Sequence, residues 1–418
     1  MKKRILLLVL GIVMLVSCTA VLMAAEHRVV TWQVWVTPNL TKTFYETVVK
    51  AFEAKNPGIQ VELVEANAGT EPNADNFIKT RIAAGNVPDL MTNITVSSFA
   101  DADLLWEIPV NDPDLKNVIN LKSTMYKGKM YSFVTEVQPQ GLIFYNKKLW
   151  AQAGLKDTPK TWAEMEAACA KIKAKGLTPI LTSGDWVSGY LFSALCGEDV
   201  FGKNTKWYTD RYAGKVKFTD KDWISAANYF NRLVKKGYFN QGALSMSYAD
   251  LEPQFFAGKA VMYPMGSWFA ASEDKASKDF EVGVFMVPSQ KGTRHLLTGE
   301  SFGNIGVYSK SKNVQDAWKL WKFYRLDPVY GAKLLEVDSL FSSVKGLTYS
   351  MSPLQQEIQA LIPQAVSTSA HANNKVGSVP PNGIMDVYQK VGQTFLTGKA
   401  TNVKATLGML DDFWEKSK

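Results

Sequence analysis

The sequence contains little cysteine and histidine, which limits the metal and disulfide chemistry that it can support. Among its 418 residues are three Cys and three His. The histidines, His27, His295 and His371, are far apart, and no spacing of Cys and His is typical of a zinc site. A small disulfide-stapled fold is excluded, because that class is rich in cysteine. We expect neither a metal nor a cofactor.

Long apolar runs are also scarce, and the marked one is typical of an export signal. Basic residues at 2–4 precede an apolar run at 5–16, which is short for a membrane span and suits a signal peptide over 1–25. Cleavage before Cys18 would leave a lipid-anchored protein, whereas cleavage near Glu26 would release a soluble one; both alternatives stay open. In either case we expect the mature chain outside the cytoplasm, in the periplasm or at the cell surface.

Common catalytic motifs and clustered basic residues are missing too. No G-x-S-x-G elbow, Walker loop or H-E-x-x-H helix occurs. The mature chain loses three basic residues and keeps a formal charge of 44 − 39 = +5, and no Lys/Arg cluster interleaved with aromatics suggests nucleic acid. A secreted glycan-processing enzyme would need an isolated carboxylate pair, which the sequence does not single out. We expect a binding protein rather than an enzyme.

Apolar periodicity alternates between strand and helix along the chain. A β-branched and aromatic run at 29–35 predicts a strand. The spacing of Phe44, Val48 and Phe52 predicts a helix, and the alternation at 59–63 predicts a second strand. This β-α-β unit indicates a sheet covered by helices, and therefore an α/β fold.

Further elements are expected downstream. The turn Tyr-Lys-Gly-Lys at 126–129 is expected to lead into a strand at 131–134, and Thr161 with Glu164 predicts a capping box that begins a helix. The other expected strands are 142–145, 179–182, 260–263 and 281–287. Other expected helices contain Trp223, Trp318 and Trp414, and the polar stretch 367–383 is expected to be a surface loop.

Two cysteines, Cys169 and Cys196, remain after the signal. In an oxidising compartment they could form a disulfide. Both lie in segments with helical periodicity, beside Ala and Leu, so two buried free thiols are an equally good interpretation. The sequence leaves this choice open.

Aromatic residues are abundant at 12%, and several tryptophans lie outside periodic apolar faces. Trp35, Trp186, Trp207 and Trp268 lie at or just past predicted strand ends, next to Gly, Ser, Thr or Pro. Sugars present flat C–H faces to aromatic rings, and a ring that buries about 60 Å² of apolar surface contributes roughly 1.5 kcal/mol. These rings favour a carbohydrate as the ligand class.

Several short motifs follow one another in a fixed order. They are AGNVPDL at 84–90, YKGKMY at 126–131 leading into GLIFYNKKL at 141–149, PKTWAEM at 159–165, FAGKAVMY at 256–263 leading into GSW at 266–268, and GKAT at 398–401. In this set and spacing the chain resembles the family 1 extracellular solute-binding proteins, the sugar-binding lipoproteins of ABC importers. The resemblance covers nearly the whole mature chain.

The resemblance implies an α/β fold of two lobes, each a central mixed β-sheet flanked by helices. Lobe 1 is expected to comprise 26–138 and 299–340, and lobe 2 to comprise 139–298 and 341–418. The chain would cross between the lobes several times, and the ligand cleft would lie between them.

Crossings are expected near 136–140, 299–302 and 340–344. The lobes would close on the ligand by a hinge motion. The closed protein, a monomer, would then meet the permease subunits and ATPase of the importer, which must be separate chains because this one has neither membrane spans nor a P-loop.

The same resemblance assigns candidate ligand residues to loops that would face the cleft. Trp268 is expected to stack on a sugar ring, with Trp186 beside it and Asp185 accepting from a hydroxyl. The other candidates are Gln138 and Gln140 at the first crossing, Glu300 and Ser301 at the second, Trp35 and Thr37 after the first strand, Asn93 and Thr95 after the strand at 90–91, and Asn382 in the late loop. Trp207 is a further candidate because it lies beside turn residues. Hinges and turns use the same polar side chains for their own hydrogen bonds, so a structural role for each polar candidate stays open.

An anionic ligand, such as an acidic sugar or a sugar phosphate, is the alternative within the same fold. A basic mature chain permits it, and an arginine facing the cleft would favour it, because the guanidinium fork suits carboxylate and phosphate. Arg211, Arg232 and Arg294 are the candidates, and none lies in a segment assigned to the cleft.

Overall fold

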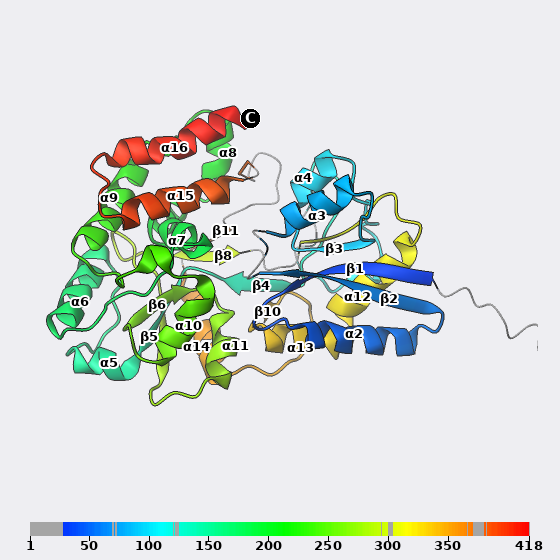
Figure 1. Cartoon of the computed structure of the whole chain (residues 1–418), viewed down its shortest axis with the longest axis horizontal. Helices are drawn as coiled ribbons and strands as arrows, with labels where there is room; N and C mark the ends of the chain where they lie inside the picture. Colours follow the sequence, from blue (N-terminus) through cyan, green and yellow to red (C-terminus); the bar gives the residue numbers. More distant parts are fainter. Residues whose placement is uncertain are drawn as a thin grey trace, which may run out of the picture.

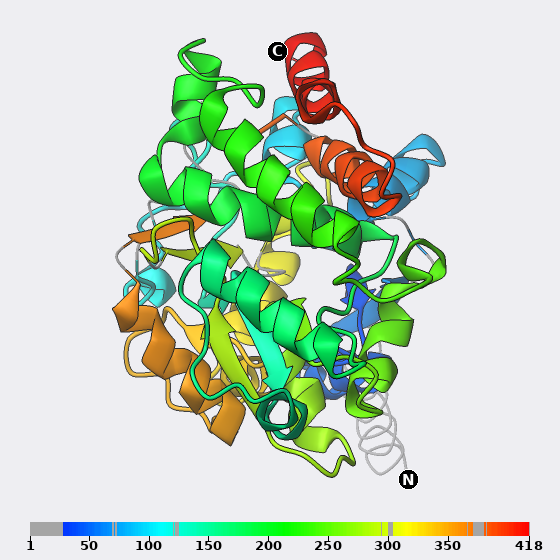
Figure 2. The ribbon, with the colours of Figure 1, turned by 90° about the vertical axis from the view of Figure 1, so that its left-hand side faces the viewer.

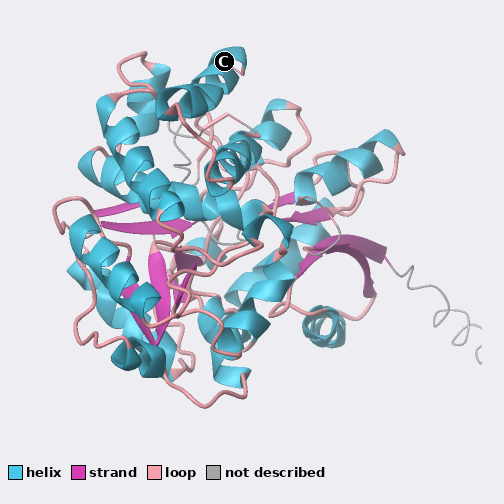
Figure 3. Cartoon of the chain, turned by 60° about the vertical axis from the view of Figure 1, so that its left-hand side comes forward, coloured by secondary structure: helices cyan, strands magenta, loops and turns pink. Residues whose placement is uncertain are grey.

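Two lobes, each with its own sheet, are joined by a third sheet (Figure 1). The computed structural model describes residues 28–68, 71, 73–119, 121, 125–293, 295–299, 304–365, 367–370, 380–381 and 383–417, and for 295–299 and 367–370 it describes the backbone. Helices surround the strands of both lobes (Figure 3). None of the helices in this part of the chain combines the length and the apolar character that a membrane crossing requires.

Lobe 1 is built around a four-stranded sheet of order β2-β1-β3-β9. Its strands are β1 (Arg28–Val36), β2 (Ile59–Asn67), β3 (Leu90–Thr92) and β9 (Ile305–Val307). Strand β1 is parallel to β2 and β3, and β9 is antiparallel to β3. The helices are α2 (Lys42–Lys55), α3 (Ala74–Ala83), α4 (Val96–Asp101), α12 (Val314–Leu326) and α13 (Tyr330–Val337), with the 3-10 turn η1 (Pro113–Leu115).

The core of lobe 1 combines distant parts of the chain. Its buried residues come from 30–133 and 305–340. The ring of Trp32 in β1 makes edge contacts with Tyr45 of α2 and Tyr324 of α12, at centroid distances of 5.4 and 5.0 Å. The late helices α12 and α13 therefore complete the core that β1 begins.

Lobe 2 has an antiparallel sheet of order β6-β5-β7 and most of the helices. Its strands are β5 (Leu142–Asn146), β6 (Met262–Met265) and β7 (Val282–Met286). Its helices are α5 (Lys147–Gln152), α6 (Trp162–Ala174), α7 (Trp186–Lys203), α8 (Trp207–Tyr212), α9 (Lys221–Lys235), α10 (Tyr248–Phe256), α11 (Phe269–Lys275), α14 (Pro353–Leu361), α15 (Ile384–Leu396) and α16 (Val403–Lys416), with 3-10 turns η3 (Ala243–Ser245) and η4 (Ile362–Gln364).

Helices α7, α9, α15 and α16 form a helical layer of lobe 2 (Figure 2). Helices α7 and α15 approach each other through glycines. A Cβ at Gly189 would lie 2.5 Å from the backbone nitrogen of Gln389, and one at Gly392 would collide with the backbone oxygen of Ser188. Only glycine permits this close helix crossing.

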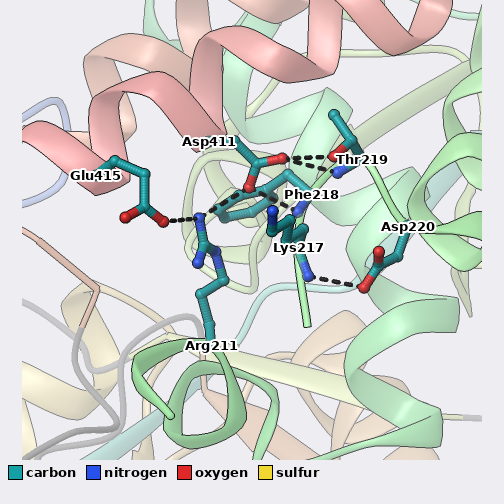
Figure 4. Close-up of polar contacts among 7 residues, drawn as sticks. All are labelled: Arg211, Lys217, Phe218, Thr219, Asp220, Asp411 and Glu415. Atoms are coloured by element: carbon teal, nitrogen blue, oxygen red, sulfur yellow. Dashed lines mark hydrogen bonds and ion pairs between the residues drawn. The ribbon is translucent and has the colours of Figure 1, made fainter. Parts of the chain in front are cut away.

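The C-terminal helix α16 is held to the rest of lobe 2 by a partly buried polar cluster (Figure 4). Arg211 of α8 donates to Asp411 at 3.0 Å and to Glu415 at 2.9 Å. The Asp411 carboxylate also accepts from the backbone nitrogens of Phe218 and Thr219, both at 3.0 Å. Because the Arg211 side chain is 1% exposed, its charge depends on these partners for compensation.

The third sheet, of order β10-β4-β8-β11, contains the segments where the chain changes lobe. Its strands are β4 (Glu136–Pro139), β8 (His295–Gly299), β10 (Phe341–Ser342) and β11 (Ser367–Ala370). Strand β4 is antiparallel to both β8 and β10. Beside this sheet, Glu136 forms a buried ion pair with Arg325 of α12, which ties β4 to lobe 1.

Most predicted elements form, with some corrections. The capping box of Thr161 and Glu164 is confirmed, and so is the turn at 126–129, where Lys127 and Gly128 have φ of 49° and 79°. The predicted strand at 131–134 is wrong: Phe133 instead stacks on Trp321 in the core, with ring centroids 4.8 Å apart. The predicted strand at 179–182 is reduced to isolated bridges at Ile180.

The structure also answers two expectations about the cysteines and the loop at 367–383. Cys169 and Cys196 are buried free thiols, so the interpretation without a disulfide is confirmed. Within the expected loop at 367–383, residues 367–370 form β11 parallel to β8, so the loop prediction is wrong for them. An isolated polar segment carries no local signal for a strand whose partner lies about 70 residues earlier in the chain.

Candidate functional site

Four aromatic side chains of lobe 2 gather at one place, and we call Trp186, Tyr190, Tyr248 and Trp268 the aromatic group. The ring of Trp186 lies 5.0 Å from that of Tyr248 and 6.4 Å from that of Trp268, and the rings of Tyr190 and Trp268 are 6.0 Å apart. Trp186 is 39% exposed, whereas Trp268 is 8% exposed. The group therefore offers a large apolar ring to the surface, backed by buried rings.

Asp185 brings the starts of α7 and α10 together and so places two of these rings. Its Oδ1 accepts from Ser183 Oγ at 2.6 Å and from the backbone nitrogen of Val187 at 3.2 Å, which caps α7. Its Oδ2 accepts from the backbone nitrogen of Tyr248 at 2.5 Å. Both oxygens are thus engaged by the protein, and the described contacts give Asp185 the role of holding Trp186 and Tyr248 side by side.

The Gly-Ser-Trp segment at 266–268 fixes the Trp268 ring. The ring folds back over Gly266, and a Cβ at that position would collide with it, so any residue other than glycine there would block the ring. The backbone nitrogen of Ser267 donates to the oxygen of Pro139 at 2.8 Å. The segment is therefore tied to β4, the first strand that joins the lobes.

Gln138 and Gln140 lie where they were expected, in and just after β4. The Tyr190 hydroxyl donates to the backbone oxygen of Gln140, which links the aromatic group to the joining sheet. Gln138 is 2% exposed, and its Nε2 has no hydrogen-bond partner among the described residues. A buried amide donor of this kind is costly to leave unpaired, so Gln138 is a polar group with binding capacity to spare.

The lobe 1 candidates lie at or just after the carboxyl ends of β1 and β3, two parallel strands that end at the same side of the sheet. Trp35 is buried against Ala66 and Ala74, and Thr37 Oγ1 accepts from the nitrogen of Leu40 at 2.9 Å. Asn93 has φ of 64°, a left-handed conformation that Asn tolerates.

Thr95, the N-cap of α4, has no side-chain capping bond, but its nitrogen donates to Asp75 at 2.8 Å. Together with Trp35, Thr37 and Asn93 it places polar and aromatic groups along the strand-end edge of lobe 1.

Asn39, which the sequence analysis missed, connects this edge to the aromatic group. Its Nδ2 donates to the backbone oxygen of Trp268 at 3.1 Å and to Asp338 Oδ1 at 3.0 Å. Burial raises the pKa of Asp338 to about 7, against the opposing hydrogen bond from Asn39. Through the hydrogen bond from Asn39, the loop after β1 in lobe 1 is in direct contact with the backbone of Trp268 in lobe 2.

Other candidates lie elsewhere. Trp207 was expected past a strand end, but it is the first residue of α8 and is buried in the core of lobe 2, 4.5 Å from the ring of Phe218. A polar Lys-Asn-Thr-Lys run before Trp207 has the composition of a loop, which is why the prediction was wrong. The candidates Cys18, Glu300, Ser301 and Asn382 lie outside the described residues.

The acidic side chains described at the aromatic group are Asp185 and Glu252, and Lys275 of α11 acts on the nearby Asp338. The Tyr248 hydroxyl donates to Glu252 at 3.5 Å, and burial raises the pKa of the Glu252 carboxyl, against hydrogen bonds from Ser272 and Tyr248. Among the described residues no cluster of His, Cys, Asp or Glu is arranged to hold a metal ion. The site can thus offer ring faces, amides and hydroxyls, which suit an uncharged polar ligand.

Comparisons with known proteins agree on one family and fold. The sequence profile described as bacterial extracellular solute-binding protein matches residues 37–328. The multiple sugar-binding protein of Streptococcus mutans serotype c is 28% identical over 319 residues, which cover 74% of this chain and 74% of that protein.

Among solved structures, a chitin oligosaccharide binding protein has a TM-score of 0.78 at 25% identity, covering 94% of this chain and 99% of that one. RafE in complex with raffinose has a TM-score of 0.73 at 23% identity, covering 93% of this chain and 100% of that one, which is a likeness of fold.

Proposed function

The chain belongs to the bacterial extracellular solute-binding proteins, and on that premise we propose that it binds a carbohydrate between its two lobes. The ligand would be a mono- or oligosaccharide, held by aromatic stacking and hydrogen bonds and enclosed by hinge closure. The protein would act as a monomer outside the cytoplasm, anchored through Cys18 if that residue is lipidated, and would deliver the sugar to the permease of an ABC importer.

The aromatic group is the observation that carries this proposal. One ring that buries about 60 Å² of apolar sugar surface contributes roughly 1.5 kcal/mol. Two such rings would supply about 3 of the roughly 8 kcal/mol that a micromolar complex requires, and hydrogen bonds would supply the rest. The relatives named as binding multiple sugars and chitin oligosaccharides support the same ligand class.

The arginines described favour a neutral over an anionic ligand. Arg211 is held by Asp411 and Glu415, and Arg232 pairs with Glu166. Neither belongs to the aromatic group, and the third candidate, Arg294, lies outside the described residues. A carboxylate or phosphate would require a guanidinium or ammonium facing it, so the acidic ligand remains the second candidate for the screen below.

A thermal-shift screen of the signal-free protein tests the proposal. The panel contains raffinose, stachyose, chitin oligosaccharides, monosaccharides, polyols, sugar acids and sugar phosphates. Millimolar ligand on a micromolar site stabilises the folded state by about 4 kcal/mol, which raises Tm by several degrees. A shift with a neutral sugar supports carbohydrate capture, a shift with acidic ligands alone supports the second candidate, and no shift with any compound contradicts the proposal.

Matched variants show whether the aromatic group is the site. Trp186→Ala removes an exposed ring from the group, and we expect at least a tenfold weaker Kd by calorimetry. Tyr212→Ala removes a ring of similar exposure (38%) that packs against Trp414 of α16, and should leave Kd unchanged. Equal Kd values for the wild type and Trp186→Ala would place the sugar elsewhere.

A further inference from the structure

One side chain of the β1 loop reaches across to the other lobe. The two N–H groups of the Asn39 amide are both in use: one donates to the Trp268 oxygen of lobe 2 at 3.1 Å and the other to Asp338 Oδ1 of lobe 1 at 3.0 Å. Asn39 is thus held within lobe 1 by Asp338, the residue that caps the C-terminus of α13. From that position it binds the backbone of Trp268, the residue that we expect to stack on the sugar.

Lobe 2 contacts the other end of the same amide. Ser272 Oγ donates to Oδ1 of Asn39 at 3.3 Å. Trp268, Ser272 and Lys275 follow each other at i, i+4 and i+7, so they share one face of the segment that forms α11. The charge of Lys275 lowers the pKa of Asp338, although burial of that carboxyl has the larger, opposite effect. One face of α11 is therefore directed at both Asn39 and Asp338.

This contact is sheltered from water. Asn39 is 8% exposed and Asp338 is 2% exposed, although both lie at the junction of two lobes. Water cannot readily replace a hydrogen bond at such a position, so each bond contributes more than a surface bond does. The neighbouring backbone is also constrained, since Ser339 has φ of 47°, a conformation in which non-glycine residues are uncommon.

We propose that Asn39 is a latch between the lobes that joins lobe closure to the placement of the Trp268 ring. In this proposal, opening of the hinge separates Asn39 of lobe 1 from the Trp268 oxygen of lobe 2. A ligand that holds the Trp268 ring in its stacked position would then also stabilise the closed arrangement, and closure would in turn stabilise the stacked ring. The inference rests on the proposed hinge closure but not on the identity of the ligand, because the latch consists of the chain's own atoms.

Small-angle X-ray scattering of the protein without added sugar tests the latch. Asn39→Ala removes both donors, and Asn39→Asp keeps the shape of the side chain but sets a carboxylate against Asp338. The control is Asn56→Ala: Asn56 is also a buried lobe 1 amide, but it donates within its own lobe, to the Phe52 oxygen at 2.7 Å. Because the latch consists of the chain's own atoms, it should keep a share of the sugar-free wild type in the closed arrangement. We therefore expect a larger radius of gyration for both Asn39 variants and no such change for the control. Superimposable scattering for all four proteins would overturn the proposal.

Calorimetry with a sugar from the thermal-shift panel gives a second readout. Asn39→Ala loses two interlobe hydrogen bonds, to the Trp268 oxygen and from Ser272, and should weaken binding about tenfold or more, whereas Asn56→Ala should bind like the wild type. An unchanged Kd for Asn39→Ala would contradict the coupling of latch and ligand. If the wild type binds no member of the panel, the proposed function fails, while the scattering comparison still decides whether the latch exists.

Discussion

Replacing Asp338 by asparagine should reduce the pH dependence of stability. The carboxyl is buried, and its pKa is raised from 3.8 to about 7. A carboxyl with a raised pKa binds a proton more tightly in the folded state than in the unfolded state. It therefore contributes stability below pH 4, and this contribution is lost as the pH rises toward 7. Between pH 5 and pH 8 the loss for one such group is roughly 2–3 kcal/mol.

Urea unfolding at both pH values measures this term. The free energy of unfolding of the wild type should fall by about 2–3 kcal/mol more between pH 5 and pH 8 than that of Asp338→Asn. The variant keeps an acceptor for Asn39, and any cost of its new unpaired N–H is independent of pH, so the difference between the two slopes isolates the carboxyl. Equal pH dependence in the two proteins would refute the assignment of a buried, proton-binding Asp338.

Three further predictions follow from close contacts and buried charge. Gly266→Ala should displace the Trp268 ring, weaken sugar binding at least tenfold in calorimetry and lower the free energy of unfolding by about 1–3 kcal/mol, because the ring is part of the core of lobe 2. Gly392→Ala places a methyl group against the backbone of α7 and should lower the free energy of unfolding by about 1–3 kcal/mol. The control is Gly408→Ala in α16, where a Cβ would meet no neighbouring atom, and it should raise the free energy of unfolding by about 0.5–1 kcal/mol. Equal effects of the two substitutions would contradict the close helix crossing. Arg211→Ala leaves its carboxylate partner on α16 partly uncompensated and should cost about 3 kcal/mol in urea unfolding, so a loss below about 1 kcal/mol would show that the buried pair contributes little.

Local signals in the sequence were sufficient where the structure depends on neighbouring residues. The capping box of Thr161 and Glu164 needs only three residues of spacing, and the turn at 126–129 needs Gly128 at a positive φ. The strand predicted at 131–134 failed for the opposite reason. Its apolar residues fit a strand or a buried coil equally well, and the choice is made by contacts with Trp321, which is distant in the chain.

The candidate site shows the same division. Trp186 and Trp268 were recognised because they lie next to turn residues, but Tyr190 and Tyr248 lie on helices, and nothing local shows which way those helices face. Asn39 and Asp338 are 299 positions apart, so their contact has no signature in either segment. The sequence indicates where tryptophan rings follow strands. Which rings contact one another, and which side chains bind their backbone, depends on the folded structure.

The hydrophobic cores of lobe 1 and lobe 2 each combine segments that are far apart in the sequence. This arrangement has a consequence for folding during synthesis. Trp32 is covered by Tyr324, which emerges 324 − 32 = 292 residues later during synthesis, and lobe 2 lacks α15 and α16 until the chain is nearly finished. Contacts between such distant residues form slowly, because long loops must close first. Such a chain should remain incompletely folded while it is being synthesised, which would suit the location outside the cytoplasm that we propose for it.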